Sequence, residues 1–501
     1  MIKLIYRIES DYMSKKRMLI VTSVTLSVVT ISLGIVKLYQ TYALSNYIGT
    51  VTDTGIDVYI NDDSYASIPA NGSSNVYYML TNTNPDTVKY GVAYQTTSGV
   101  TVKVYDTSED PATGTIEEND KKYIKLHLEN KNSTNKTIEL STVLGYENGG
   151  DLVVPSGVTL VTDTYTPPPT AAEYITKLYT TASKTTVTNN SITYNTAPSV
   201  SLMNDRLGGT TTDLDGGNIR YYGASPNNYI YFNCSDYSNQ TSSTCETWRI
   251  IGVFDGKLKL IRGSQIGKYS WDNKNTSTGA EDNYGKNDWT TARLMKLLNP
   301  RDYYKVDSND NNLGQSLYYN SASGKCYSGQ NNATVDCDFT STGIKNDETR
   351  NMIAETTYYL GGWNSYSVYP NEIYEYERGT TVYTGRPPTW PGKIALAYPS
   401  DYGYAADLNQ CKDKTLYYYD NSTCTSNNWM KAILGTSSHG WLLTPYSGHS
   451  YYAWHVRSGG NVYSYLAYGA YGAVPVLSLS SELGIESGGD GSSSNPYKLS
   501  A

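Results

Sequence analysis

The run of three prolines, Pro167 to Pro169, sets the strongest limit on how this chain folds. Proline lacks a backbone N–H and holds φ near −65°, so a run of prolines ends helices and central strands and stiffens a connection. All six Cys and all eight Trp of the 501 residues follow this run, between residues 234 and 454. We therefore expect at least two domains that differ in kind, joined at the prolines.

An uncharged segment lies near the N-terminus. Met18 to Val36 spans 19 residues without a charge, about the length of a helix that crosses a bilayer, and Lys15, Lys16 and Arg17 directly precede it. The positive-inside rule then predicts a cytoplasmic N-terminus over residues 1–17 and a transmembrane anchor over 18–38. The bulk of the chain would be extracellular at the cell membrane. A cleaved signal peptide is the alternative, although no clear A-x-A site follows the segment.

The six cysteines fall into three neighbouring pairs, and each pair encloses a short polar loop. An oxidising compartment favours three local disulfides among the fifteen possible pairings. A metal site is less favoured, because no C-x-x-C occurs and no His has zinc-finger spacing to a pair. The expected disulfides are Cys234 with Cys245, Cys326 with Cys337, and Cys411 with Cys424.

Period-two alternation of apolar residues marks the chain before the prolines. Such alternation indicates half-buried strands, and turn clusters such as ANGSSN and NTNPD separate the runs. Six or seven short strands over residues 48–165 are typical of a β-sandwich of immunoglobulin-like type. The alternating sets are Ile56, Val58 and Ile60; Val100, Val102 and Val104; and Ile124, Leu126 and Leu128.

After the prolines, residues 166–214 form a linker that includes a short helix, TAAEYITKLYTTA, with Thr170 as its cap. WRIIGVF and KLKLIRG are expected as strands of a hairpin that turns at Asp255-Gly256. Helices are expected at NDWTTARLMKLLNP, with Asn287 or Asp288 as cap, at ETRNMIAETTYYLGG and at SNNWMKAILG. The segment from WLLTPYSG through VPVLSLSSEL is again β, so the class of this domain is α+β with few helices.

The order of several motifs resembles an uncharacterised domain of bacterial cell-surface proteins. The motifs are YIYFN, TWRIIGVFDGKLKLI, NDWTTARLMKLLN, KIALAYPSDYGYA, GWLLTPYSG, HVRSGGNV, GAVPVLSLSSEL and GDGSSSNPYKL. That family is similar to the C-type-lectin-like fold of formylglycine-generating (sulfatase-modifying) enzymes. The resemblance implies a disulfide-stabilised C-type-lectin-like domain over residues 215–500. One departure is Gly472-Ala473-Val474-Pro475, where the family often has G-V-R-P, so no contact through that arginine is carried over.

The same resemblance bears on catalysis. The enzymes of the family use a reactive cysteine pair near the C-terminal part of the domain, whereas the last cysteine here, Cys424, has an expected disulfide partner in Cys411. The resemblance therefore implies the fold and not the activity, and we expect a non-catalytic protein. An enzyme related to the formylglycine-generating type remains an alternative, as does a structural envelope protein without a specific ligand.

The run from His449 to Tyr471 is rich in Tyr, Ser, Gly and Asn, the residue types of antibody binding surfaces, because Tyr offers a large contact area at low entropy cost. Relatives with this fold display variable residues on such C-terminal loops. A Tyr-lined strand face packed on loops is the equally weighted alternative. The predicted ligand-binding residues, for an extracellular glycan or protein, are Tyr446, Tyr451, Tyr452, His455, Arg457, Tyr463, Tyr465, Tyr468 and Tyr471.

Other kinds of site have weaker support. His439, His449 and His455 cluster near Ser and Tyr, but no acid partner or G-x-S-x-G motif accompanies them, which favours surface histidines over a general base. Asp272, Glu281 and Asp282 offer oxygen ligands for Ca²⁺, against the favoured interpretation of a solvated loop before a helix. No other cofactor is expected. The net charge of −8 argues against nucleic acid as a partner.

Overall fold

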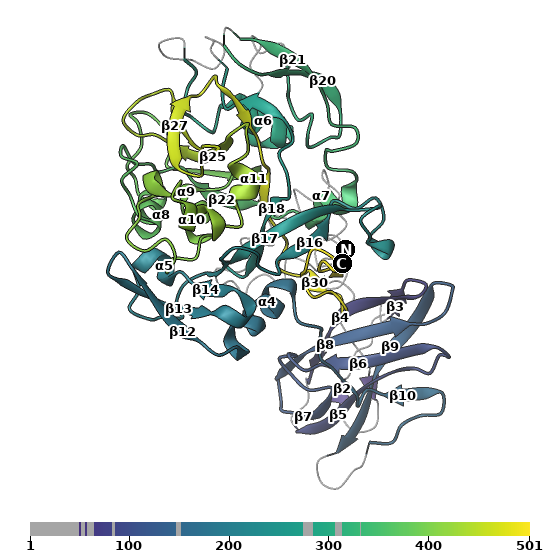
Figure 1. The fold of residues 1–501 in the computed structure, drawn as a ribbon. Helices are drawn as coiled ribbons and strands as arrows, with labels where there is room; N and C mark the ends of the chain where they lie inside the picture. The colour runs from purple at the N-terminus through teal and green to yellow at the C-terminus, as the bar shows by residue number, and fades with distance from the viewer. Residues whose placement is uncertain are drawn as a thin grey trace. The chain divides into compact units, whose positions relative to one another are not determined.

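The computed structural model describes residues 50–51, 56–57, 65–82, 86–146, 152–273, 284–305, 313–330 and 332–500. It divides the chain within the proline run into two compact units, Met1–Pro168 and Pro169–Ala501 (Figure 1). The anchor predicted over residues 18–38 lies outside the described residues. Within the described ranges, the structure contains no helix that combines the length and the apolar character needed to cross a membrane.

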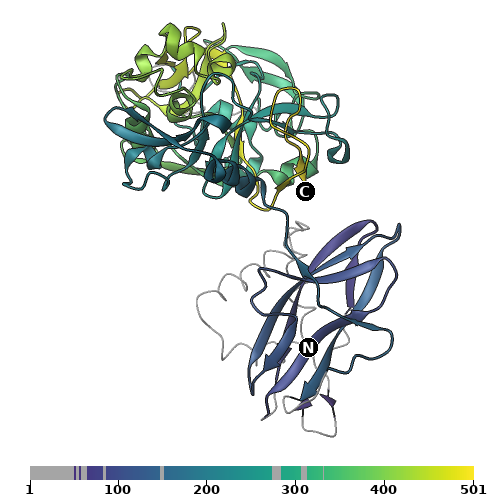
Figure 2. The ribbon, with the colours of Figure 1, turned by 60° about the horizontal axis from the view of Figure 1, so that its bottom comes forward.

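Two sheets form the N-terminal unit, and Figure 2 shows them as facing layers. The first sheet has the strand order β10-β5-β9-β3 with β7 also paired to β5, and the second has the order β11-β6-β8-β4. In chain order the strands are β1 (Thr50–Val51), β2 (Ile56–Asp57), β3 (Tyr65–Ile68), β4 (Gly72–Thr81), β5 (Val88–Gln95), β6 (Val100–Tyr105), β7 (Thr113–Ile116), β8 (Lys121–Asn130), β9 (Lys136–Tyr146), β10 (Val158–Leu160) and β11 (Thr164–Tyr165).

The alternation predicted from the sequence explains how these sheets pack. Ile124, Leu126 and Leu128 of β8 are fully buried, and the register places Leu126 opposite Val76 of β4. Cross-strand partners share a face of the sheet, so each strand turns one apolar row inward. Residues from both sheets contribute to one core, which makes the unit a sandwich. Ile56 lies in β2, whereas Val58 and Ile60 are outside the described residues.

The C-terminal unit is built on a nine-stranded sheet in the order β12-β13-β14-β15-β17-β18-β29-β24, with β16 paired to β17, and a five-stranded sheet in the order β19-β28-β25-β26-β27. Its strands are β12 (Thr185–Asn189), β13 (Ile192–Ala197), β14 (Leu202–Asn204), β15 (Ile219–Tyr221), β16 (Tyr229–Phe232), β17 (Glu246–Phe254), β18 (Lys257–Arg262), β19 (Lys268–Ser270), β20 (Ser323–Tyr327), β21 (Thr334–Asp338), β22 (Thr356–Tyr359), β23 (Thr389–Gly392), β24 (Ile394–Ala395), β25 (Gly440–Pro445), β26 (Tyr452–Val456), β27 (Val462–Leu466), β28 (Ala470–Gly472), β29 (Val476–Ser478), β30 (Gly484–Ile485) and β31 (Leu499–Ser500).

The two-residue hairpin predicted at Asp255-Gly256 joins β17 to β18, and both residues have positive φ, at 49° and 70°. A tight turn of this hand follows the twist of the two strands, which is why Asp-Gly suits it. The VPVLSL segment forms β29, which lies between β18 and β24 inside the larger sheet. Val474, Val476 and Leu477 are fully buried, and the β structure predicted for this segment is confirmed.

The helices are few and short. They are α4 (Ala171–Thr181), α5 (Arg206–Gly209), α6 (Arg293–Leu298), α7 (Asp347–Met352), α8 (Pro370–Arg378), α9 (Pro399–Tyr404), α10 (Ser422–Ser426) and α11 (Lys431–Leu434), with the 3₁₀ turn η5 (Leu416–Tyr418). The prediction for α4 is confirmed: Thr170 and Glu173 cap its N-terminus reciprocally.

Three helix predictions are wrong in extent. The helix expected at SNNWMKAILG is confined to α11, because the Asn428 side-chain oxygen accepts from the Met430 N–H and holds a turn before it. The helix expected in ETRNMIAETTYYLGG ends at Met352, and Thr356–Tyr359 pairs as strand β22 with β23, because its β-branched and aromatic residues suit a pleated sheet. The helix expected from Asp288 begins only at Arg293, since the Asp288 carboxylate accepts from the Thr290 N–H and holds a turn before it. In these segments strand pairing or a local side-chain hydrogen bond is more favourable than a longer helix, although the apolar spacing is helical.

All three predicted disulfides are present and all lie in the C-terminal unit: Cys234–Cys245, Cys326–Cys337 and Cys411–Cys424. Each closes a short local loop, with sequence separations of 11, 11 and 13 residues. The start and the end of this unit also meet, because the Ala171 N–H donates to the Leu483 carbonyl.

Candidate functional site

The aromatic run of the sequence folds into one edge of the five-stranded sheet. Strands β26 and β27 form a hairpin in which His455 pairs with Tyr463 and Ala453 pairs with Tyr465. Paired residues share a face, so Tyr463 and Tyr465 stand on the same side of the edge strand. Within the described sheet β27 has a strand partner on one side only, and it stands at the left of the C-terminal unit in Figure 1.

Aromatic rings form a connected network over this edge, which we call the aromatic surface. Its rings belong to Tyr284, Tyr366, Tyr417, Tyr418, Tyr446, His449, Tyr451, Tyr452, Tyr463, Tyr465 and Tyr471, and the buried His455 ring links the last two to Tyr463. Tyr366 stacks on Tyr463 with the ring centroids 4.3 Å apart, and Tyr284 lies 5.0 Å from Tyr451. These spacings are typical of favourable aromatic pairs.

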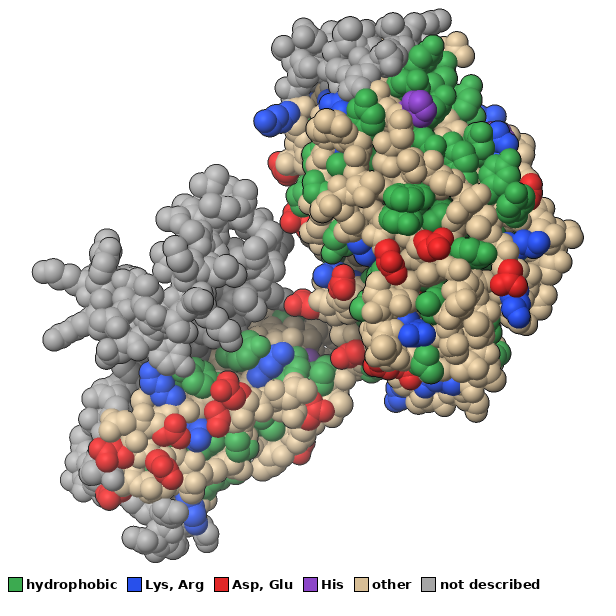
Figure 3. All heavy atoms as spheres, turned by 90° about the vertical axis from the view of Figure 1, so that its left-hand side faces the viewer, with side chains coloured by type: hydrophobic (Ala, Val, Ile, Leu, Met, Phe, Trp, Pro, Cys, Tyr) green, Lys and Arg blue, Asp and Glu red, His purple; other side chains and the backbone are tan. Residues whose placement is uncertain are grey.

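Several rings of the aromatic surface are open to solvent. Tyr418 is 55% exposed, Tyr284 39%, Tyr465 37% and Tyr417 36%. Trp441 and Trp454 in the same sheet are fully buried. Figure 3 views the molecule from the β27 side and shows apolar side chains scattered over this face, separated mostly by uncharged polar atoms. Scattered apolar side chains are ordinary on a protein surface, so the feature that points to binding is the connected set of exposed tyrosine rings at the sheet edge.

The structure brings together residues that the sequence did not connect. Tyr366 and Tyr417 contact Tyr463, although they are far from it in the chain, and the Tyr366 hydroxyl hydrogen-bonds to Ser464 Oγ at 2.6 Å. Neither lies in a segment where Tyr alternates with small residues, so the sequence around them did not predict that they belong to the aromatic surface. Only the packing of η5 against β27 places Tyr417 there.

The nine predicted ligand-binding residues differ in their exposure. His455 and Tyr468 are only 2% and 8% exposed, so they lie beneath the surface and support it. Tyr446, Tyr451, Tyr452, Tyr463 and Tyr471 are half-buried, while Tyr465 and Arg457 are exposed. Burial raises the pKa of Tyr471 to about 12, so its hydroxyl stays protonated at neutral pH.

Asp272, one of the three candidate Ca²⁺ ligands, is fully buried, and its carboxylate accepts from the Lys286 N–H at 2.8 Å. It therefore holds backbone groups in place. Glu281 and Asp282 lie outside the described residues. Among the residues that the structure describes, no group of three His, Cys, Asp or Glu side chains is arranged to hold a metal ion.

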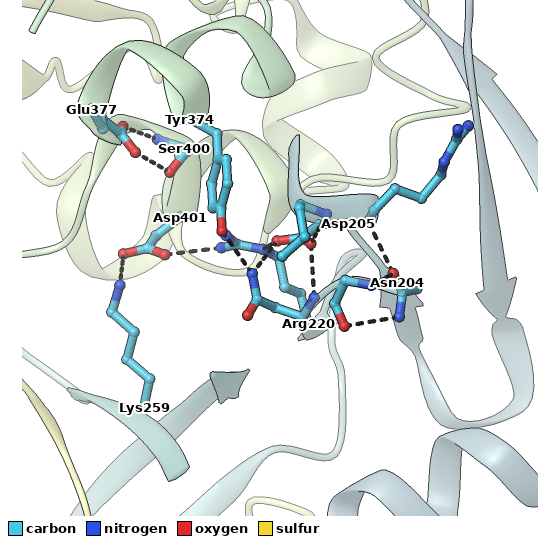
Figure 4. A network of polar contacts seen from close by, with 12 residues as sticks. Asn204, Asp205, Arg220, Lys259, Tyr374, Glu377, Ser400 and Asp401 are labelled. Atoms are coloured by element: carbon cyan, nitrogen blue, oxygen red, sulfur yellow. Dashed lines mark hydrogen bonds and ion pairs between the residues drawn. The ribbon is translucent and has the colours of Figure 1, made fainter. Parts of the chain in front are cut away.

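A network of buried charged side chains lies in the C-terminal unit apart from the aromatic surface (Figure 4). The Arg220 guanidinium donates to Asp205 at 2.6 Å and to Asp401 at 2.9 Å, and Lys259 Nζ lies 2.5 Å from the other Asp401 oxygen. Burial acts to raise the pKa of Asp401, but the two cations outweigh it and hold that pKa below its usual range. Two anions thus balance two cations.

Glu377 lies beside this network and is fully buried. It accepts from the Ser400 N–H at 2.9 Å and from the Ser400 hydroxyl at 2.5 Å, and burial raises the pKa of Glu377 to about 7. A raised pKa is also a mark of catalytic acids. Here, however, the four charged residues of the network are at most 5% exposed, which favours a structural tie between the sheet and α9.

The cysteines are the remaining side chains that could carry chemistry. All six are paired in disulfides, so none offers a free thiol. Without a free thiol, the groups that face solvent at and beside the aromatic surface are the phenol rings, the imidazole of His449 and the guanidinium of Arg457. These groups are suited to binding a ligand. Comparison of the chain with protein-family models and with curated proteins gave no match.

Proposed function

We propose that this chain is a membrane-anchored extracellular protein that binds a glycan or protein ligand through the aromatic surface of its C-terminal unit. The observation that carries the proposal is the exposure of connected rings at a sheet edge, in a unit that buries most of its other large aromatics. Rigid rings with polar tips bind both sugar faces and protein hot spots.

The N-terminal sandwich, in this proposal, is an immunoglobulin-like spacer, and the C-terminal unit is a C-type-lectin-like domain. The mostly β architecture with short helices and three disulfides supports the second assignment. Disulfides also suit an extracellular location, because they persist in oxidising compartments. The anchor rests on the uncharged segment from Met18 to Val36 alone.

An enzyme of the formylglycine-generating type is the competing hypothesis. Its chemistry needs a reactive thiol, and the pairing of all six cysteines supports the binding hypothesis over it. A thiol titration of the purified chain under denaturing conditions separates the two, since a free thiol would favour the enzyme.

Replacement of Tyr417, Tyr463 and Tyr465 together by Ser tests the proposal. The variant should lose binding on an array of glycans and host-cell proteins, because truncation of exposed aromatic anchors removes the contact area while the rings beneath keep the fold. Tyr65→Ser, at a ring 49% exposed in β3 of the other unit, is the matched control. Unchanged binding by the triple variant would refute the proposed site. Repeating the array in EDTA shows whether Ca²⁺ is required.

A further inference from the structure

Basic groups gather at one end of the aromatic surface, and we call them the basic cluster: Lys268, His439 and Arg457. The exposed Arg457 guanidinium lies over the Tyr463 ring, with its central carbon 4.3 Å from the ring centroid. The Ser458 N–H, next in the chain, donates to His439 Nδ1 at 2.9 Å. The loop after β26 therefore holds Arg457 and His439 side by side.

Lys268 reaches the same place from another strand. It pairs with Gly472 across β19 and β28, and the Gly472 N–H donates to the carbonyl of Ser438, the neighbour of His439. Gln265 Nε2 donates to the His439 carbonyl at 2.6 Å and fixes the backbone there. His439 itself has a positive φ of 53°. Three separate segments thus converge on one point.

No carboxylate neutralises this cluster among the described residues. Neither Lys268 nor Arg457 takes part in an ion pair with a described residue, in contrast to Arg262 and Lys286 of the same unit. Asp420 lies beside Gly459 in the adjoining loop and forms no ion pair with Arg457. In a chain of net charge −8, such a local excess of positive charge is an anion-binding feature.

We propose that the basic cluster binds an acid group of the ligand, a carboxylate or sulfate on a saccharide whose ring stacks on the exposed Tyr465, while Tyr463, held between Tyr366 and Arg457, positions the guanidinium. This inference rests on the proposed function and narrows it to acidic glycans. Arg457 supplies a planar guanidinium that accepts a carboxylate or sulfate in a bidentate way. The neighbouring rings, capped by hydroxyls, match a sugar that presents C–H faces for stacking and hydroxyls for hydrogen bonding.

The histidines make this binding sensitive to pH. Burial, and then Arg457 and Lys268, hold the pKa of His439 below its usual range. His455 lies beneath it, with ring centroids 5.7 Å apart, and its Nδ1 has no hydrogen-bond partner among the described residues. The aromatic groups that also face His455 are Trp441, Tyr463, Tyr465 and Tyr471. Protonation of His439 gives up the hydrogen bond that Nδ1 accepts from the Ser458 N–H, but a bound anion beside Arg457 offsets the local positive charge and this loss, so affinity should rise as the pH falls.

The test is a glycan array in which each glycan bearing a uronic acid, a sialic acid or a sulfate is printed beside a counterpart that lacks the acid group. The full chain should bind acidic members at least about tenfold more tightly than their counterparts. Arg457→Ala should remove most of that difference. Lys177→Ala, in the exposed face of α4 at the other end of the unit in Figure 1, is the charge-matched control and should leave it unchanged.

Titration calorimetry with the tightest-binding acidic glycan at pH 5.5 and 7.5 tests the predicted dependence of affinity on pH. Wild type should bind more tightly at pH 5.5, and His439→Asn, which tolerates the positive φ, should lose that dependence. Equal binding of acidic and neutral counterparts, or binding of proteins alone, would overturn the acidic-glycan inference. Either result leaves the proposed function standing if Tyr463→Ser still abolishes that binding.

Discussion

The histidine that lies beneath the aromatic surface shows what burial does to a single residue. His455 is 2% exposed and lies within ring contact of His439 and Tyr471. Burial, and then His439 and Arg457, hold the pKa of His455 well below its usual 6.5. The neutral ring therefore supports the surface, whereas a charged ring would have to be desolvated without a partner.

The sign of this shift predicts a loss of stability in acid. The unfolded chain takes up a proton on His455 below pH 6.5 while the folded chain resists it, so stability is complete above that pH and falls below it. Replacing His455 by Phe removes the titration and keeps a ring. Urea unfolding followed by Trp fluorescence should show wild type losing stability relative to His455→Phe from pH 7 to pH 5. A constant difference across that range would contradict the prediction.

At the scale of elements, the buried charge network ties parts of the C-terminal unit that are distant in sequence. Arg220 lies in β15, Lys259 in β18 and Asp401 in α9, and each is at most 5% exposed. Rings of Phe254 and Tyr404 also enclose the guanidinium, with centroids 4.5 and 4.8 Å from its central carbon. The network therefore fixes α9 against the larger sheet.

Loss of one partner from this network should be costly. Asp401→Asn leaves two buried cations facing the single anion Asp205, and we expect a loss of about 3–5 kcal/mol in the free energy of unfolding. Asp347→Asn breaks the exposed pair with Arg350, 2.7 Å apart, and should cost less than about 1 kcal/mol. Denaturant unfolding of both variants checks this comparison. Equal small losses would mean that the buried charges contribute little to stability.

At the scale of the whole molecule, the chain carries two kinds of stabilisation. The N-terminal sandwich has a core of its own and no cysteine, while the C-terminal unit contains all three disulfides and all eight Trp. Each closed loop of this length stabilises a fold by about 2–4 kcal/mol, mainly by restricting the unfolded chain.

Reduction should therefore affect the two units differently. Calorimetry of the chain should show two transitions, and dithiothreitol should lower the temperature of only the one that coincides with the change in Trp fluorescence. Protein carried through the same steps without dithiothreitol is the control, because its disulfides stay intact. A single transition would show that the units unfold as one, and an equal shift of two transitions would contradict the separate role of the disulfides.

The local features of the structure followed from local sequence patterns. Thr170 predicted the start of α4, Asp255-Gly256 predicted the turn between β17 and β18, and each cysteine paired with its nearest neighbour in the chain. These signals work because the interacting atoms are only a few residues apart. The same reasoning failed at Thr356–Tyr359, where pairing with the distant β23 overrides a helical pattern.

The sequence by itself determined that Tyr, Ser and Gly gather before the last buried strand, and thus where a binding surface was to be sought. Only the tertiary structure decided which rings belong to it. It buried His455 and Tyr468, and it added Tyr366 and Tyr417 from distant loops. The physical reason is that alternation tells which residues share a strand face, whereas exposure depends on what the rest of the chain packs against that face.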